Sequence, residues 1–408
     1  MTLSALDRVL ISDEFVADPY PVLRQLREEQ PVYWCETIGA WLVTRFDDVM
    51  VTFRDVAQYS NEGRLGKATE YLPPDTRSRF AAFEDHYRTP SLLHSDPPAH
   101  TRLRGLVRDT FTPRAVAAME PRIKAITDDL LDHAVRAGGM DAISELAAAL
   151  PAIVISDVFG VPEADRSLFV GWSDAILAFQ GVNKPSVGIL EEAQATLLLL
   201  RAYLTEMIQE RRRAPRDDLL GALVAAEEAG DRLTEEELIN TSVTLLVAGH
   251  ETTRSLIGNG LYLLLSDRTR WQLLLDEPAL VKPAIEEMLR FESPVPRQPR
   301  LMRTDAELGG QRLRQGQMVY QMLNAANRDP EHFTEPETFD IRRQGNRHLA
   351  FGNGIHFCLG APLARLEGQI AFTALLARVP ALRLVSPEPD WDTGKRNSRL
   401  LRTLPILF

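Results

Sequence analysis

The stretch Phe351-Gly-Asn-Gly-Ile-His-Phe-Cys358-Leu-Gly360 places one cysteine in a glycine-rich loop, directly before an apolar run over 361–376 that is typical of a helix. Glycines at 352, 354 and 360 allow positive φ and a close approach of the backbone to a neighbour. Backbone N–H groups turned toward the sulfur, and the positive end of the following helix dipole, stabilise a thiolate. The loop therefore predicts a thiolate ligand for a soft or borderline metal, haem iron included.

A lone cysteine is more often a small buried hydrophobic side chain, so the residue type alone favours a structural role. The whole pattern F-G-x-G-x-H-x-C-x-G indicates more, because every fixed position is present. It resembles the haem-binding loop of the cytochrome P450 family. The resemblance implies that Cys358 ligates haem iron and that Phe351, His356 and Gly360 lie against the cofactor, haem b (iron protoporphyrin IX).

Length, composition and charge describe a globular chain. The 408 residues suffice for one large domain or two ordinary ones, and 45% are hydrophobic and 25% charged. A net charge of -11 argues against a nucleic-acid binder. Cys35 and Cys358 can form at most one disulfide, and neither a signal peptide nor a membrane span is indicated. We therefore expect a cytoplasmic protein that binds neither nucleic acid nor membrane.

The chain as a whole is predicted to be mainly α with a smaller β-rich part. The helical ranges are about 97–291 and 360–378, and the β-rich ranges are about 31–60, 295–320 and 382–407. A short helix is expected at 20–29, an irregular region at 61–90, and a connection between two helices at 180–188. No repeat, low-complexity block or linker divides the chain, so residues 1–408 are expected to form a single domain.

One predicted helix is unusually long. Thr234 followed by Glu237 is a capping box, and the apolar pattern then continues from Leu238 to about Leu265. A helix of this length is expected to cross the whole body.

The middle of that helix reads Ala248-Gly-His-Glu-Thr-Thr253. A glycine in a helix interior costs about 1 kcal/mol relative to alanine. One interpretation is a harmless kink. The other is that Gly249 leaves room for a ligand, while Glu251 and Thr252 bring an acid and an alcohol to it.

Further segments match the cytochrome P450 family in the expected order. His100 and Arg104 are four residues apart and share a helix face. The resemblance implies that this pair, together with Arg300 and His356, binds the haem propionates, whose carboxylates suit guanidinium and imidazole donors. Without the resemblance these side chains would be solvated surface groups.

Glu287-Met-Leu-Arg290 has the form of any ion pair at i,i+3, but it precedes the cysteine loop by about 70 residues. At this distance from the cysteine loop, the Glu287–Arg290 pair resembles the buried structural ion pair of the family, and we assign it a role in folding. Where a common form of the later loop carries an arginine, this chain has Thr338. The third partner of the pair is therefore open, with Arg343 as a possible substitute.

The resemblance extends from about residue 18 to 407 and implies a P450-like single domain with a long central helix. It implies a bacterial-type monooxygenase that inserts one oxygen atom from O2 into an apolar small molecule or natural product. Thr252 would donate a hydrogen bond where oxygen is activated, and Glu251 would relay protons from solvent. NAD(P)H-derived electrons would arrive through an iron–sulfur ferredoxin and its ferredoxin reductase, docking a monomer near Arg108, Arg114 or Arg365.

The substrate pocket implied by the resemblance has mostly apolar walls, as ligand pockets usually do. Its expected residues are Leu245, Ala248, Val295, Arg297, Leu400 and Leu401, and Ala248 and Gly249 also face the haem. Arg297 allows two interpretations: it points outward or covers a propionate, or it faces the pocket and pairs with an acidic or oxygenated substrate.

Two alternative functions stay open. A peroxide-driven haem-thiolate oxygenase needs no electrons, although the Glu251–Thr252 pair argues against it. A non-catalytic haem sensor or binding protein needs an output domain, for which the chain leaves no room. A zinc site is not supported, because the other histidines and Cys35 lack ligand spacing.

Overall fold

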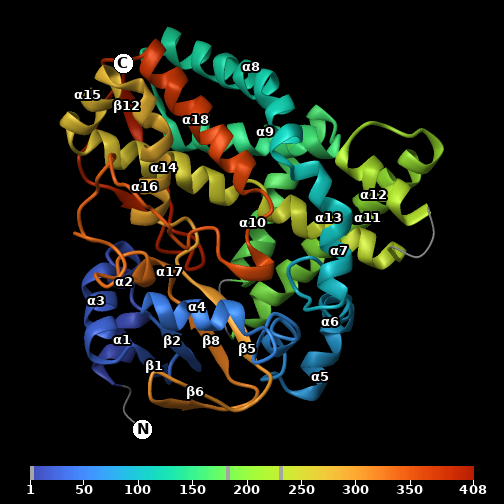
Figure 1. The fold of residues 1–408 in the computed structure, drawn as a ribbon. Helices are drawn as coiled ribbons and strands as arrows, with labels where there is room; N and C mark the ends of the chain where they lie inside the picture. Colours follow the sequence, from blue (N-terminus) through green and yellow to red (C-terminus); the bar gives the residue numbers. More distant parts are fainter. Residues whose placement is uncertain (1–3, 181–183, 229–232) are drawn as a thin grey trace.

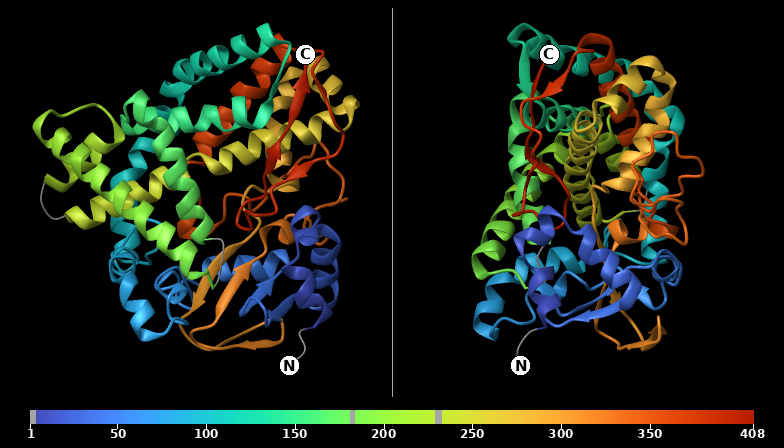
Figure 2. Two further views of the ribbon diagram at one scale, coloured as in Figure 1. Left: turned by 180° about the vertical axis from the view of Figure 1, so that it is seen from behind. Right: turned by 90° about the vertical axis from the view of Figure 1, so that its left-hand side faces the viewer.

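The computed structural model of the protein describes residues 4–180, 184–228 and 233–408. A large helical body lies above a smaller β-rich part, with the N-terminal end of the chain at the β-rich part and the C-terminus at the far edge of the helical body (Figures 1 and 2). The mainly helical architecture with a smaller sheet part confirms the predicted fold class.

The helices alternate with short connections along the chain. Those of the first hundred residues are α1 (Ala5–Leu10), α2 (Asp13–Ala17), α3 (Tyr20–Glu29), α4 (Phe46–Arg54), α5 (Pro74–Arg77) and α6 (Ala81–Arg88). The helical body contains α7 (Ala99–Val107), α8 (Pro113–Ala137), α9 (Ala149–Phe159), α10 (Arg166–Gln180), α11 (Val187–Arg213), α12 (Leu219–Glu228), α13 (Glu235–Ala248), α14 (Glu251–Leu265), α15 (Arg268–Asp276), α16 (Val281–Phe291) and α18 (Ala361–Arg378). The short helix α17 (Leu323–Ala326) packs against α3 and α4, next to the β-rich part (Figure 1). Short 3₁₀ turns occur at Gly66–Ala68, Ser78–Phe80, Arg108–Phe111, Glu163–Asp165, Pro278–Leu280 and Gly354–His356, and a π-helical turn at Ile143–Ala147.

The strands form one larger sheet and three small ones. The larger sheet has the order β1-β2-β8-β5-β3, with only the β2–β8 pair parallel. Its strands are β1 (Val32–Cys35), β2 (Ala40–Val43), β3 (Tyr59–Ser60), β5 (Gln298–Met302) and β8 (Met318–Gln321). The small sheets pair β6 (Ala306–Leu308) with β7 (Gln311–Leu313), β10 (Asp390–Trp391) with β11 (Leu401–Thr403), and β4 (Gly139–Asp141) and β9 (Arg383–Leu384) with β12 (Pro405–Leu407).

Local sequence explains where the helices begin and end. The Thr112 side chain accepts a hydrogen bond from the N–H of Ala115, and Pro113 opens α8, which stops at Gly138 with φ of 78°. The predicted helix at 20–29 is α3. The region 61–90 is less irregular than predicted, since α5 and α6 lie within it. Of the predicted connection at 180–188, residues 181–183 lie outside the described residues.

The prediction of a single long helix from Thr234 requires a correction. This segment begins as expected, with a complete capping box between Thr234 and Glu237, but it is two helices, α13 and α14. The break is at Gly249 and His250, where the N–H of Gly249 bonds to Leu246 and the ladder resumes only from His250. The apolar periodicity continues across both helices, so it does not reveal the break.

A buried ion-pair network fixes α16 to the loop before the cysteine. Arg290 donates to both Glu287 oxygens at 2.7 Å, and both side chains are fully buried. Arg343 Nε lies 3.2 and 3.1 Å from the same two oxygens, and Asn346 donates at 3.0 Å. Arg343 is therefore the third partner, as the sequence allowed, and Asn346 is a partner that the sequence analysis missed.

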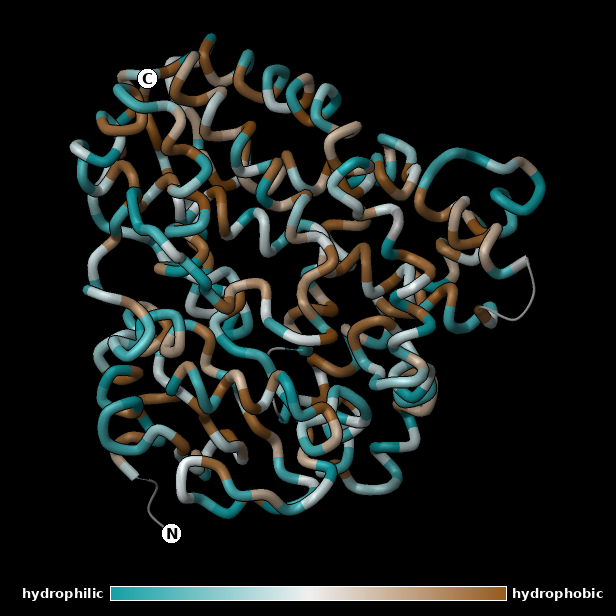
Figure 3. The backbone as a smooth tube through the Cα atoms, viewed as in Figure 1, coloured by the Kyte–Doolittle hydropathy of each residue, from teal (hydrophilic) through white to brown (hydrophobic). Residues whose placement is uncertain are grey.

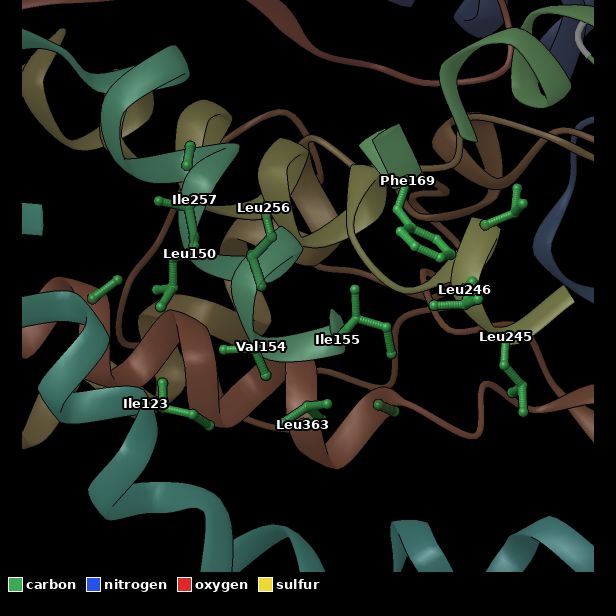
Figure 4. Packing of buried hydrophobic residues seen from close by; sticks show 14 of the residues in the cluster. Ile123, Leu150, Val154, Ile155, Phe169, Leu245, Leu246, Leu256, Ile257 and Leu363 are labelled. Atoms are coloured by element: carbon green, nitrogen blue, oxygen red, sulfur yellow. The ribbon is translucent and has the colours of Figure 1, made fainter. Parts of the chain in front are cut away.

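The main core gathers between α9, α14 and α18. Figure 4 shows Val154 and Ile155 of α9 facing Leu256 of α14 and Leu363 of α18, and all four belong to one apolar cluster that lines or adjoins the site described below. Along α8, at the upper edge of Figure 3, hydrophilic and hydrophobic residues alternate, as expected of a helix with one buried face. Within the described ranges, no helix is both long and apolar enough to span a bilayer.

Candidate functional site

A cavity of about 350 Å³ lies inside the molecule where α13, α14 and the start of α18 meet the cysteine loop. Most of its wall is apolar, with Ile155, Ile176, Val295 and Leu363 among the lining side chains. Of the site residues predicted from the sequence, the cavity wall contains Arg104, Leu245, Ala248, Gly249, Glu251, Thr252, Val295, Arg297, Arg300, Phe351, His356, Cys358 and Gly360.

The cysteine loop closes on itself through a hydrogen bond from the Cys358 N–H to the Phe351 carbonyl, at 2.9 Å. Gly352 and Gly354 both have φ of 70°, as predicted. A Cβ at Gly354 would approach the Phe53 carbonyl oxygen of α4 to 2.8 Å, so the loop needs glycine there for close packing as well. Gly360 differs from the prediction: its φ is -80°, and it serves as the N-cap of α18.

Cys358 is exposed by surface area, and its surface opens into the cavity. The surrounding protein is nevertheless dense enough that burial raises the pKa of the thiol. The N–H groups of Gly360 and Ala361 and the guanidinium groups of Arg104 and Arg365 oppose that effect and favour the thiolate. The predicted donors are therefore present, and a cation bound at the sulfur would complete the stabilisation.

Polar groups without partners gather beside this loop, on the His100 side of the cavity. Among the described residues, both ring nitrogens of His100 and Nε2 of His356 are buried without a hydrogen-bond partner, and the centres of the two rings are 4.2 Å apart. The Asp96 carboxylate lies 3.9 Å from His356 Nε2, too far for a hydrogen bond. Arg300 is 4% exposed, and within the described residues its side chain donates one hydrogen bond, to the carbonyl of Pro299. Burial lowers the pKa of Arg300 to about 9, and nearby Arg64 acts in the same direction.

This arrangement fits haem. Buried donors without acceptors are costly, and the two propionate carboxylates of haem would satisfy those of His100, Arg300 and His356. Arg104 already donates to the carbonyl of Phe357 at 2.7 Å, which holds it against the loop. The apolar wall would cover the porphyrin, and the exposed sulfur would reach the iron. His100 itself lies behind the cavity wall, in contact with His356.

The acid and the alcohol lie at the break between α13 and α14. Thr252 and Glu251 both line the cavity, in the first turn of α14. The glycine before them is explained by packing, because a Cβ at Gly249 would approach the Ile155 side chain to 2.5 Å. Gly249 thus leaves room for Ile155, which itself lines the cavity. The interpretation of this glycine as a harmless kink does not include the contact with Ile155.

Glu251 is bound by residues that the sequence analysis missed. Its carboxylate is 3% exposed, and it accepts hydrogen bonds from the Ser398 hydroxyl and from Lys395 Nζ, the latter at 2.5 Å. Lys395 also bonds to Asp174 of α10 at 2.8 Å, and Asp174 reaches the surface. These contacts join residues more than 70 positions apart, so no local sequence pattern indicates them.

The substrate side of the cavity requires a correction. Leu400 and Leu401 do not line the cavity: both are buried, and Leu401 packs in the main core at the start of β11. The strand β11 begins only at Leu401, and Asn397 and Ser398 of the preceding loop form the cavity wall instead. Arg297 faces the cavity, with its guanidinium 4.6 Å from the centre of the Tyr320 ring.

The three arginines predicted to dock a redox partner differ in their surroundings. Arg365 forms a bidentate pair with Glu286 at 2.7 Å, so its charge is largely used within the protein. Arg108 and Arg114 are exposed near the start of α8. No cluster of His, Cys, Asp and Glu in the described ranges could hold a metal by itself.

Comparison with known proteins agrees with this geometry. The cytochrome P450 family model matches residues 65–382. The chain is 42% identical over 410 residues to the cytochrome P450 monooxygenase PikC of Streptomyces venezuelae, covering 98% of this chain and 94% of that protein. It is 40% identical over 380 residues to the vitamin D(3) 25-hydroxylase of Pseudonocardia autotrophica, covering 92% and 90%.

Among solved structures, P450BioI in complex with an acyl carrier protein carrying hexadec-9Z-enoic acid superimposes with a TM-score of 0.89 and 35% identity, over 97% of this chain and 100% of that one. The sulfur facing the cavity, the unsatisfied donors beside it and these matches lead to one conclusion. The chain belongs to the cytochrome P450 family.

Proposed function

We propose that Cys358 is the iron ligand of this haem-thiolate monooxygenase, and that residues 1–408 act as a single monooxygenase domain. As a cytochrome P450, the enzyme uses haem b, O2 and electrons derived from NAD(P)H. When bound, the haem supplies the oxygen-activating chemistry, and the protein supplies binding, orientation and proton delivery. The observation that carries the proposal is the Cys358 sulfur, exposed only toward an interior cavity and faced by backbone N–H groups.

The remaining site residues divide by what they touch. The haem propionates are held by His100, Arg104, Arg300 and His356. Three of these, His100, Arg300 and His356, have buried donors that need acceptors. Ala248, Gly249, Phe351 and Gly360 form walls against the cofactor. Leu245, Val295 and Arg297 line the side on which a substrate binds.

Thr252 and Glu251 move protons. The Thr252 hydroxyl has no hydrogen bond to any other part of the described chain, so it is available to a molecule in the cavity. Glu251 reaches the surface through Lys395 and Asp174, which gives a route for protons from solvent. An intact acid–alcohol pair with such a route favours O2-dependent turnover over the peroxide-driven alternative.

The electron donor is an iron–sulfur ferredoxin with its reductase, and the substrate is an apolar small molecule or natural product, in keeping with the largely apolar wall. Arg108, Arg114 and Arg365 are the candidates for docking an acidic ferredoxin; Arg108 and Arg114 are exposed, and Arg365 pairs with Glu286. A cytoplasmic location and a monomeric state stay predictions from the sequence.

A reconstitution experiment tests the proposal. Purified protein receives ferredoxin, ferredoxin reductase, NAD(P)H and an apolar ligand that shifts its haem spectrum. We expect O2 and NAD(P)H consumption to rise with the ligand and an oxygenated product to form. Product formation that requires only hydrogen peroxide would favour the peroxide-driven alternative, and no product with either oxidant would favour a haem-binding protein without catalysis.

A further inference from the structure

One end of the cavity is cationic and lies next to the propionate donors Arg300 and His356, which Arg64 influences electrostatically. Arg64 lines this end together with Gln180 and Pro299, and the same three residues border a small adjoining hollow with Tyr320. Arg297 stacks on the same Tyr320 ring, at 4.6 Å from its centre. Arg64 and Arg297 thus lie at one tyrosine, in a region whose wall also includes the imidazole of His94.

Among the described residues, the carboxylate that acts on Arg64 is Asp96, which lies beyond ion-pair distance and already pairs with Arg303. No residue in the described ranges forms a hydrogen bond or an ion pair with Arg64, and its Nε is buried without a partner. Burial lowers the pKa of Arg64 to about 10, which still leaves the guanidinium charged at neutral pH. A charge removed from water without a partner is expensive, so this arrangement is expected to be completed by an anion.

The charges along the cavity wall also favour an anion at this end. Four guanidinium groups line it, those of Arg64, Arg104, Arg297 and Arg300. The carboxylate of Glu251 is already paired with Lys395, and burial raises the pKa of Glu367 well above its usual value, which disfavours its charged form. The two haem carboxylates offset two of the four positive charges, and a further negative group is needed at the Arg64 end.

We propose that Arg64 anchors a carboxylate, or another anionic group of similar geometry, on the substrate, with Arg297 beside it as a second donor. The inference rests on the proposed monooxygenase function and narrows its substrate class to apolar molecules with one acidic end. A planar guanidinium binds a carboxylate through two parallel hydrogen bonds, and the apolar wall accommodates the rest of the molecule. The acid would be held at the Arg64 end, and carbon atoms remote from it would face the Cys358 side.

Spectral titration of the haem-loaded protein tests this. The probes are straight-chain acids from octanoic to dodecanoic acid, each paired with its methyl ester, at a pH where the acids are ionised. The variants are Arg64→Met, which removes the charge, and Arg64→Lys, which keeps the charge but loses the bidentate fork. Arg213→Met is the control, because Arg213 is exposed at the end of α11. Haem content per protein is measured for each variant.

The wild type is expected to bind the acids tighter than the esters by about tenfold or more, as for a charge-assisted hydrogen bond in a buried site. Arg64→Met should reduce this preference to about twofold or less, Arg64→Lys should retain part of it, and Arg213→Met should leave it unchanged. Ester affinity and haem content should stay at wild-type levels in all variants.

The proposal is overturned if the wild type shows no preference for the acid in any pair, or if Arg64→Met keeps the preference. It is also overturned if Arg64→Met loses haem while the haem-loaded fraction still prefers the acid, because Arg64 would then serve a propionate. Ligand binding needs no electrons, so these outcomes are distinct from failure of the monooxygenase function, which would show as missing product in the reconstituted system.

Discussion

Lys395 Nζ lies 2.5 Å from the carboxylate of Glu251, and the two residues are 144 positions apart in the chain. The same C-terminal loop supplies Ser398, which donates to the other Glu251 oxygen and also lines the cavity. The loop that forms part of the cavity wall therefore also fixes the acid that precedes Thr252. Through Lys395 and Asp174, this loop connects the start of α14 to α10.

The Glu251–Lys395 pair predicts a pH-dependent stability. Burial lowers the pKa of Lys395, but Glu251 and Asp174 outweigh it, so the pKa is raised above the usual 10.5. A raised folded-state pKa stabilises the fold fully below the unfolded-state value, and the effect is lost as pH rises through the folded-state pKa. Lys395→Met should therefore lower the free energy of unfolding by about 1–3 kcal/mol near pH 8.

The difference from the wild type should shrink between pH 8 and a pH well above 10.5, as Lys395 loses its proton first in the unfolded state and then, at its raised folded-state pKa, in the folded state. Urea unfolding at the two pH values, followed by circular dichroism, measures this. Lys282→Met is the matched control, because Lys282 is exposed on α16. A destabilisation of Lys395→Met that is equal at both pH values would show that packing, and not the ion pair, is responsible.

Thr252→Ala should leave haem content and substrate binding nearly unchanged, since the hydroxyl has no hydrogen bond to any described residue. It should divert electrons from product to hydrogen peroxide, because a hydrogen-bond donor at the oxygen-activation site is lost. The product formed per NAD(P)H is expected to fall by about 10²-fold, the usual size of a general acid–base contribution. Thr252→Ser keeps the hydroxyl and should retain coupling; equal coupling in Thr252→Ala and the wild type would refute the role.

Arg104→Ala and Arg300→Ala should lower haem retention more than they alter substrate preference, because each removes a charged donor near a buried carboxylate. The double variant should retain least haem. Haem per protein after dialysis is the measurement, with exposed Arg213→Ala as the control. Full haem content in both single variants and in the double variant would mean that these arginines do not hold the cofactor.

Arg343→Met should destabilise the fold by about 1–3 kcal/mol, because it removes one charged donor from the buried Glu287 while Arg290 stays. The neighbouring Arg342 is exposed and pairs with Glu277 at the surface, so Arg342→Met should cost less than about 1 kcal/mol. Chemical unfolding of the two variants compares them directly. An Arg343→Met protein as stable as Arg342→Met would contradict the place of Arg343 in the network.

The sequence predicts those parts of the site that are local in the chain. Gly352, Gly354 and Cys358 form one loop, and their neighbours along the chain determine its shape. The capping box at Thr234 is likewise local. The sequence allowed a kink at Gly249, but it did not reveal the packing of Ile155, a side chain on another helix, against this glycine.

Contacts between distant segments are harder to predict. Lys395 and Ser398 reach Glu251 because of the path that the C-terminal loop takes through the fold. Along the same loop, Ser398 lines the cavity, whereas Leu400 and Leu401, only a few residues later, do not. Arg64 lies in a polar segment of ordinary composition. Arg64 lies beside the cavity together with Tyr320, a residue of the distant strand β8.

The thiolate assignment is tested most directly by the carbon monoxide difference spectrum of the reduced protein. The wild type and Cys35→Ser should both show the band typical of thiolate-ligated haem, because Cys35 is fully buried in the N-terminal part and burial raises the pKa of its thiol to about 11. Cys358→His should lose that band. A Cys358→His protein that keeps the band, or a Cys35→Ser protein that loses it, would contradict the account.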